Sequence, residues 1–193
     1  KNQVELQILK DVDPFAIDLQ AEHGFNNQGE QLSTSTILLE SLLKLGRSIV
    51  NSPQFDGYTG LRNTFFKEDG KPIREKLQPF LERAFRGPVS EATLKRYADF
   101  HKTEEERTKS YTQAMKNVVT AVLASPKFLY VVENKQDAGE RTPVNDYELA
   151  QRLALFLWSS IPDEELLTAA KRGDLREVAS LEKQVRRMLL DRR

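Results

Sequence analysis

The sequence predicts an all-α protein, an irregular bundle of about six to eight helices without a significant sheet. Apolar residues recur at helical spacing in one segment after another along the 193 residues. Proline, glycine and capping residues separate these segments at the points where helices should begin and end. No two neighbouring segments alternate apolar and polar residues as a pair of strands would, so helices are the expected structure throughout.

The first predicted element is a helix at residues 37–50, the last part of an N-terminal helical segment at residues 1–50. Its apolar side chains repeat every three or four positions, at Leu38, Leu42, Leu45 and Ile49. Asn51-Ser52-Pro53 is expected to end this helix because a proline cannot continue it. Residues 51–71 then contain three glycines, and we predict a connector there.

Residues 72–143 are predicted to form a central helical domain. Pro72 stands where its first helix begins, and Gly87-Pro88 is expected to end that helix. Ser90 is suited to cap a short second helix. Thr103-Glu104-Glu105-Glu106 has the form of a capping box, so we expect a third helix to begin there.

The last part of this central domain is less determined by propensity. After Ser125-Pro126, residues 127–133 suit a strand or a helix. A lone strand would have no partner nearby, so a short helix is the prediction. Residues 134–143 are polar and are predicted to form a loop.

Residues 144–193 are predicted to be the start of a further helical domain that the chain truncates. Asn145 and Glu148 have the spacing of a capping box, and a further helix is expected from Ser160-Ile161-Pro162. Gly173 is suited to end that helix in the left-handed conformation. Large aromatic side chains are expected to supply core area, namely Tyr147, Phe156 and Trp158.

The final predicted helix has an apolar stripe that one helix cannot bury by itself. Its members are Val178, Leu181, Val185, Met188 and Leu189. We therefore expect part of the stripe to be exposed or to be covered by another copy or fragment, which makes a homo-oligomer through this helix a candidate arrangement. On this interpretation Leu149 and Phe156 contribute more to stability than Leu181 and Met188.

Charge and composition exclude several classes of protein. Twenty-nine Lys and Arg residues balance 29 Asp and Glu residues, so there is no excess positive charge to pair with phosphates, and no nucleic-acid partner is expected. The chain has no cysteine, which excludes disulfides, zinc–cysteine sites and covalent attachment of c-type haem within it. No apolar run approaches the ~18 residues of a membrane span, and no signal peptide is recognisable in this chain.

The residue types that usually carry catalysis are few or unfocused. The two histidines, His23 and His101, do not have the spacing of a zinc-binding pair, and a solvated or capping role is expected for His101. The carboxylates of residues 104–106 and 163–165 are explained by helix capping and solvation. No metal site is predicted, and a non-enzymatic role is favoured although the enzyme question is left open.

Several strings are specific enough to indicate a family. The longest is DYELAQRLALFLWSSIPDEELL at residues 146–167, and LEKQVRRML at residues 181–189 continues it. Both resemble one domain of unknown function in the large cytochrome-c-associated proteins that are abundant in planctomycetes. Residues 83–88 (RAFRGP) and 123–130 (LASPKFLY) are similar to the preceding domain of those proteins. A third, upstream domain is resembled by residues 11–14, 24–27 and 32–40.

The resemblance has departures and implications. The family usually has an acidic residue in place of Asn26, an arginine in place of Gly87 and a tyrosine in place of Leu42. Relatives are exported, multidomain and redox-linked, which implies a periplasmic or otherwise exported location. Any c-type haem would lie elsewhere in the full-length protein, and the implied partners are other domains of the same chain or a separate protein.

The sequence therefore predicts a non-catalytic helical scaffold or interaction module of an exported cytochrome-c-type multidomain protein, itself without haem or another cofactor. The alternative is part of a redox or carbohydrate-active enzyme site in the same protein. The candidate binding residues are Asn26, Asn27, Arg83, Arg86 and Trp158. Arg83 and Arg86 flank Phe85 and are expected to bind a buried carboxylate or a helix C-terminus. The enzyme alternative would be favoured if one concave pocket were lined by Asn26, Asn27, Arg86 and Trp158 together.

Overall fold

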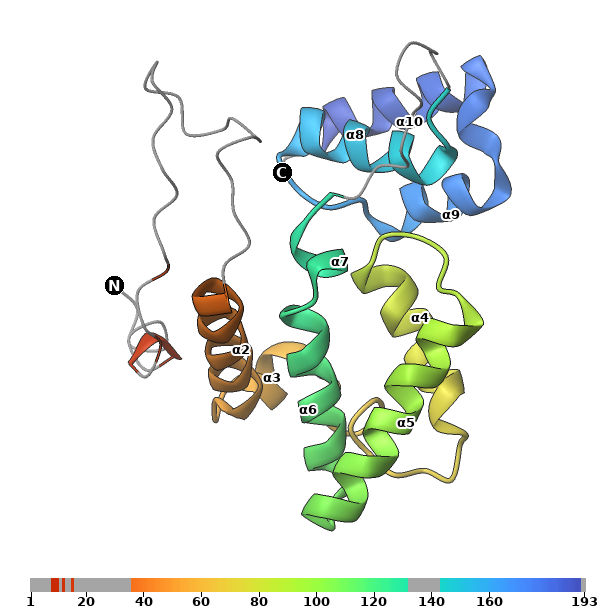
Figure 1. The fold of residues 1–193 in the computed structure, drawn as a ribbon. Helices are drawn as coiled ribbons and strands as arrows, with labels where there is room; N and C mark the ends of the chain where they lie inside the picture. Colours follow the sequence, from red (N-terminus) through yellow and green to blue (C-terminus); the bar gives the residue numbers. More distant parts are fainter. Residues whose placement is uncertain (1–7, 11, 13–14, 16–35, 132–142, 192–193) are drawn as a thin grey trace. The chain divides into compact units, whose positions relative to one another are not determined.

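The computed structural model describes residues 8–10, 12, 15, 36–131 and 143–191. Within these residues the chain forms helices and no strand, which confirms the all-α class. The elements are α2 (Thr36–Asn51), α3 (Phe55–Thr59), α4 (Ile73–Ala84), α5 (Glu91–Thr108), α6 (Tyr111–Leu123), α7 (Pro126–Leu129), α8 (Asp146–Trp158), α9 (Glu164–Arg172), the 3₁₀ turn η2 (Asp174–Arg176) and α10 (Val178–Leu190) (Figure 1).

The chain divides into two compact units, and each is built from two stretches of sequence. Unit 1 comprises Lys1–Ile73 and Lys95–Leu129, and unit 2 comprises Arg74–Leu94 and Tyr130–Arg193. Helix α5 therefore begins in unit 2 and continues in unit 1. The division into domains at 1–50, 51–71, 72–143 and 144–193 stays a prediction.

Unit 1 is organised around the packing of α2 on α6. Gly46 of α2 lies against α6, and a Cβ added there would be 3.4 Å from Thr120 Cγ2. The core of the unit is apolar, and its fully buried side chains include Val50, Met115, Val118 and Val122. The small residue lets the two helix backbones come close, so their apolar stripes bury one another.

Helices α5 and α6 follow one another through a tight turn (Figure 1). Lys109 adopts a left-handed conformation with φ of 54°, and Ser110 caps α6 by accepting a hydrogen bond from the backbone N–H of Gln113. The predicted helix start at Thr103 is therefore wrong. The Thr103 hydroxyl instead donates to the carbonyl of Asp99 within α5 at 3.0 Å, because no proline or glycine interrupts the helix there.

His101 also departs from its predicted surroundings. It lies inside α5 and is buried, whereas a solvated or capping position was expected. Its ring meets the ring of Tyr111 edge-on at 4.9 Å, and its Nδ1 is 3.7 Å from the carboxylate of Glu105. The continuous helix explains the difference, since His101 falls two turns before the end of α5 on its buried side. His23 lies outside the described residues.

Other predicted helix ends agree with the structure. Ser90 accepts a hydrogen bond from the backbone N–H of Thr93 at the start of α5, and α2 ends at Asn51. The predicted connector contains one short helix, α3. Residues 127–129, where a strand is the alternative prediction, belong to the short helix α7.

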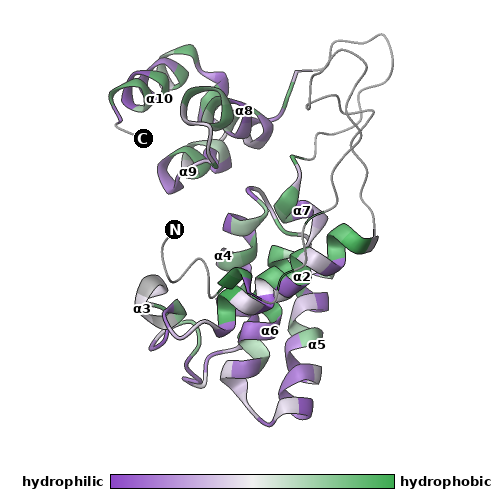
Figure 2. Ribbon diagram, turned by 90° about the vertical axis from the view of Figure 1, so that its left-hand side faces the viewer, coloured by the Kyte–Doolittle hydropathy of each residue, from purple (hydrophilic) through white to green (hydrophobic). Residues whose placement is uncertain are grey.

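The helices α8, α9 and α10 form the core of unit 2, and both hydrophobic and hydrophilic residues occur along each of them (Figure 2). Asn145 and Glu148 form the predicted capping box, with each side chain bonded to the other residue's backbone N–H at 2.9 Å. Gly173 ends α9 with φ of 77°, as predicted. The buried cluster consists of Ala150, Ala154, Trp158, Leu166, Ala169, Ala170, Leu175 and Met188.

The burial of two apolar residues in unit 2 reverses the prediction. Phe156 is 83% exposed, whereas Met188 is only 1% exposed. The inward face of α8 is formed by Ala150, Ala154 and Trp158, at a spacing of four residues, and this places Phe156 on the opposite side of the helix. The expectation that Phe156 is better buried than Met188 is therefore wrong, whereas part of the α10 stripe is exposed as expected, at Val178 and Leu189.

No helix in the described ranges combines the length and the apolar character that a membrane crossing requires.

Candidate functional site

Arg86 stands at an unusual backbone position at the end of α4. Its φ is 56°, in the left-handed region that glycine normally occupies. The backbone N–H of Gly87 donates to the carbonyl of Glu82, and that of Arg86 donates to the carbonyl of Arg83, which together form a Schellman motif. The sequence placed the helix end at Gly87, but the left-handed residue is the arginine before it. This conformation costs an L-residue roughly 1 kcal/mol.

The side chain of Arg86 is buried and hydrogen-bonded within unit 2. The residue is 6% exposed, its Nε donates to Gln151 Oε1 at 3.3 Å, and its Nη2 donates to the carbonyl oxygen of Tyr130 at 2.8 Å. Burial lowers the pKa of Arg86, yet a guanidinium stays protonated at neutral pH. Arg86 therefore joins the first stretch of unit 2 to the start of the second stretch and to α8.

Trp158, the last residue of α8, is also hydrogen-bonded to another part of unit 2. Its indole Nε1 donates to the carbonyl of Met188 at 2.9 Å, and the Arg187 guanidinium lies 5.5 Å from its ring centroid. Arg187 also forms two bonds to the Asp163 carboxylate, at 2.7 and 3.0 Å. These contacts tie the end of α8 to α10 and to the N-cap of α9.

A further tie in unit 2 was not recognised from the sequence. The buried carboxylate of Asp146 accepts from the backbone N–H of Leu175 at 3.1 Å and from Nε of Arg176 at 2.8 Å. Asp146 occupies the first turn of α8, where an acidic residue is expected in any case. Its bond to Arg176 of η2 joins two residues that are 30 positions apart, so no local sequence pattern indicates this contact.

Arg83 is placed differently from Arg86, since it lines a cavity of about 310 Å³ in unit 2. Two long ion pairs cross the rim of this cavity, Arg83 to Glu164 at 3.8 Å and Lys171 to Glu82 at 3.7 Å. Neither Arg86 nor Trp158 is among its lining residues. The remaining candidates, Asn26 and Asn27, lie outside the described residues. The site prediction as a whole stays a prediction.

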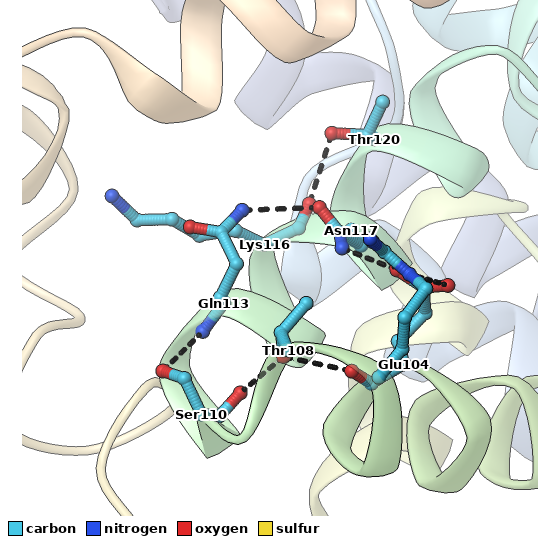
Figure 3. Close-up of polar contacts among 8 residues, drawn as sticks. Glu104, Thr108, Ser110, Gln113, Lys116, Asn117 and Thr120 are labelled. Carbon is cyan, nitrogen blue, oxygen red and sulfur yellow. Dashed lines mark hydrogen bonds and ion pairs between the residues drawn. The ribbon is translucent and has the colours of Figure 1, made fainter.

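A second polar cluster, in unit 1, surrounds Glu104 (Figure 3). Arg107 donates to both carboxylate oxygens, at 3.1 and 2.6 Å, and Asn117 Nδ2 donates to Oε2 from α6. Gln113 in turn donates to Asn117 Oδ1 at 3.1 Å. The Glu104 side chain is only 13% exposed, so the expectation of simple capping and solvation is wrong for this residue.

The electrostatics of this cluster keep the carboxylate ionised. The hydrogen bond from Arg107 lowers the pKa of Glu104, and it acts against burial, which raises it. The bond from Asn117 and the charges of Arg107 and Arg47 lower the pKa further, and the Glu104 bond in turn raises the pKa of Arg107. Glu104 at neutral pH is therefore a hydrogen-bond acceptor and not a proton donor.

The Glu104 cluster forms one side of a cavity of about 590 Å³ within unit 1. Three helices, α2, α5 and α6, supply its lining, which consists of Leu43, Arg47, Phe100, Glu104, Arg107, Asn117, Thr120 and Ala121. A signal for it exists in the sequence, because Gln113, Asn117 and Thr120 recur at helical spacing as a polar stripe beside the apolar stripe of α6. The sequence interpretation used only the apolar stripe.

The described residues contain no group of three or more His, Cys, Asp or Glu side chains that is arranged to hold a metal ion.

Among the described residues, fold and site together define an all-helical protein in which buried polar side chains connect helices within each compact unit. Residues 73–133 match the family model described as PSD5, a protein of unknown function (DUF1595). Residues 144–193 match the model described as PSD4, a protein of unknown function (DUF1592). No curated protein and no solved structure matches the chain significantly. The resemblance to two consecutive domains of unknown function is thereby confirmed, while the upstream third domain and the wider grouping stay predictions.

Proposed function

We propose that this chain is a non-catalytic helical scaffold and interaction module of an exported cytochrome-c-type multidomain protein, itself without haem. The observation that carries the proposal is the bond from Arg86 to Gln151, at 3.3 Å. Arg86 belongs to the stretch that matches PSD5, and Gln151 belongs to the stretch that matches PSD4. Both lie in unit 2, so a buried side chain holds parts of two family stretches in one compact body.

The other contacts of unit 2 support the same role. The N–H groups of Arg86 and Trp158 donate to acceptors of the protein itself, namely Gln151, Tyr130 and Met188. A side chain that binds substrate needs donors that are directed into a cavity. The alternative, a redox or carbohydrate-active site, requires Arg86 and Trp158 to line such a cavity together with Asn26 and Asn27.

The proposal is tested in the full-length protein with R86M and, as a matched control, R83M. Arg83 is the neighbouring arginine, but it is exposed and its ion pair is long. We expect R86M to admit protease cleavage within α4 or α8, the helices that Arg86 connects, and R83M to resist such cleavage as the wild type does. Haem absorbance per chain should be unchanged in both variants, since the module carries no haem.

Two results would contradict the scaffold. One is an R86M protein that remains fully resistant to the protease, because Arg86 would then hold nothing together. The other is a variant with wild-type protease resistance and circular dichroism that loses a redox or glycan-cleaving turnover of the full-length protein. That second result would favour the enzyme alternative.

A further inference from the structure

The cavity of unit 1 differs from the ties of unit 2 in having both an apolar and a polar wall. Leu43, Phe100 and Ala121 form apolar parts of the lining, and Glu104 and Asn117 form part of the polar side. Its volume of about 590 Å³ lies within the ~300–1,000 Å³ that is usual for sites of small molecules. An amphipathic ligand of modest size suits such a lining.

The charges around the cavity are not fully paired by the residues that the structure describes. Glu104 is bound by Arg107 and by Asn117. Arg47 extends into the lining from α2, and within the part of the chain that the structure describes its guanidinium forms no ion pair. The lining therefore carries two positive charges and one negative charge, and Arg47 accounts for the excess.

We propose that this cavity binds a small monocarboxylate with an apolar body, the carboxylate pairing with Arg47 and the body packing against Leu43 and Phe100. A guanidinium matches a carboxylate because its planar donors form two parallel hydrogen bonds to the two oxygens. A dianion is disfavoured because its second charge would approach the ionised Glu104, whose partners are already in place. This inference is independent of the scaffold proposal, since a module without catalysis is still able to bind a ligand.

The test uses hexanoate as the probe, with hexanamide as its uncharged analogue and adipate as its dianionic analogue. Binding to the full chain is measured at pH 7 and low salt by two-dimensional NMR. We expect hexanoate to shift the resonances of α2, α5 and α6 residues around the cavity. Hexanamide and adipate should bind at least about tenfold more weakly, because hexanamide lacks the charge that pairs with Arg47 and adipate brings a second negative charge towards Glu104.

The residue assignment is tested with R47Q and with R62Q as control. Arg47 is exposed, so its replacement should leave the fold intact, and circular dichroism checks this. Arg62 is an exposed arginine of the same unit that is not among the residues lining the cavity. We expect R47Q to weaken hexanoate binding at least about tenfold and R62Q to change it less than about twofold.

Three outcomes would overturn the proposal. Hexanoate that produces no shifts around the cavity at millimolar concentration would show that the cavity does not take a carboxylate. Equal binding of hexanoate and hexanamide would remove the role of charge. An R47Q protein that is folded and binds hexanoate as the wild type does would remove Arg47.

Discussion

Two arginines, Arg86 in unit 2 and Arg47 in unit 1, serve different purposes. In unit 2, Arg86 and Arg187 are bonded to acceptors that belong to the same unit. In unit 1, Arg47 borders a cavity and forms no ion pair among the described residues. The comparison teaches that burial and pairing, and not the type of residue, distinguish an arginine that holds a fold together from one that is available to a ligand.

The largest expected effect concerns the core of unit 2. Met188→Ala should lower the free energy of unfolding by about 2–5 kcal/mol, because it opens a cavity beneath Trp158. Phe156→Ala should change it by no more than about 0.5 kcal/mol, because that ring is exposed. Urea denaturation followed by circular dichroism measures both. Equal losses would mean that the apolar face of α8 is assigned incorrectly.

The comparison of arginines is tested directly by replacing each with methionine. Arg86→Met leaves the buried acceptors on Gln151 and Tyr130 without this donor, and we expect a loss of about 2–3 kcal/mol. Arg47→Met should cost no more than about 0.5 kcal/mol, because the side chain is exposed. Denaturant midpoints at constant m-value give the difference. Similar losses for the two variants would remove the distinction between Arg86 and Arg47.

A smaller effect should depend on pH. Glu104 has a folded-state pKa below its ordinary value of 4.5, so its stabilisation is fully present above that value and is lost as the pH falls below it. Glu104→Gln should therefore be less stable than the wild type at pH 7, by about 1 kcal/mol. The gap should narrow as the pH is lowered from 5 towards 3. Thermal unfolding at several pH values checks this, and a gap that widens in acid would contradict it.

The smallest effect is expected at Arg83. Its pair with Glu164 is 3.8 Å long and both side chains are largely exposed, so water competes for both charges. Arg83→Gln should change the free energy of unfolding by no more than about 0.5 kcal/mol. A loss as large as that of Arg86→Met would show that the rim of the smaller cavity is structural too.

Short-range sequence patterns were sufficient to predict several of the helix ends. The capping box of Asn145 and Glu148 involves neighbours three residues apart, so the sequence itself contains both partners. Gly173 ends α9 for a reason that is also local, its tolerance of the left-handed conformation. A similar local pattern was misleading at Thr103, because a capping-box sequence does not start a helix where the preceding residues already continue one.

The partners within the polar clusters lie far apart in the sequence, so short-range patterns do not predict their contacts. Arg86 and Gln151 are 65 residues apart, and the sequence near either residue gives no indication of its partner. Helix α8 is apolar on several sides, so its periodicity does not select the inward face, and Phe156 was placed inside while it is exposed. At Glu104 the run of three glutamates concealed that one of them turns towards α6 and binds Asn117.

The left-handed turn at Arg86 has a consequence for how the position tolerates change. The backbone there favours glycine or asparagine, whereas the buried acceptors require a long cationic donor. Glycine would satisfy the backbone and lose the bonds, and lysine would keep the charge without the planar fork that reaches Gln151 and Tyr130. Arginine meets the second demand and bears the backbone strain of the first, so a substitution at position 86 should be tolerated only together with a change in the turn or in the acceptors.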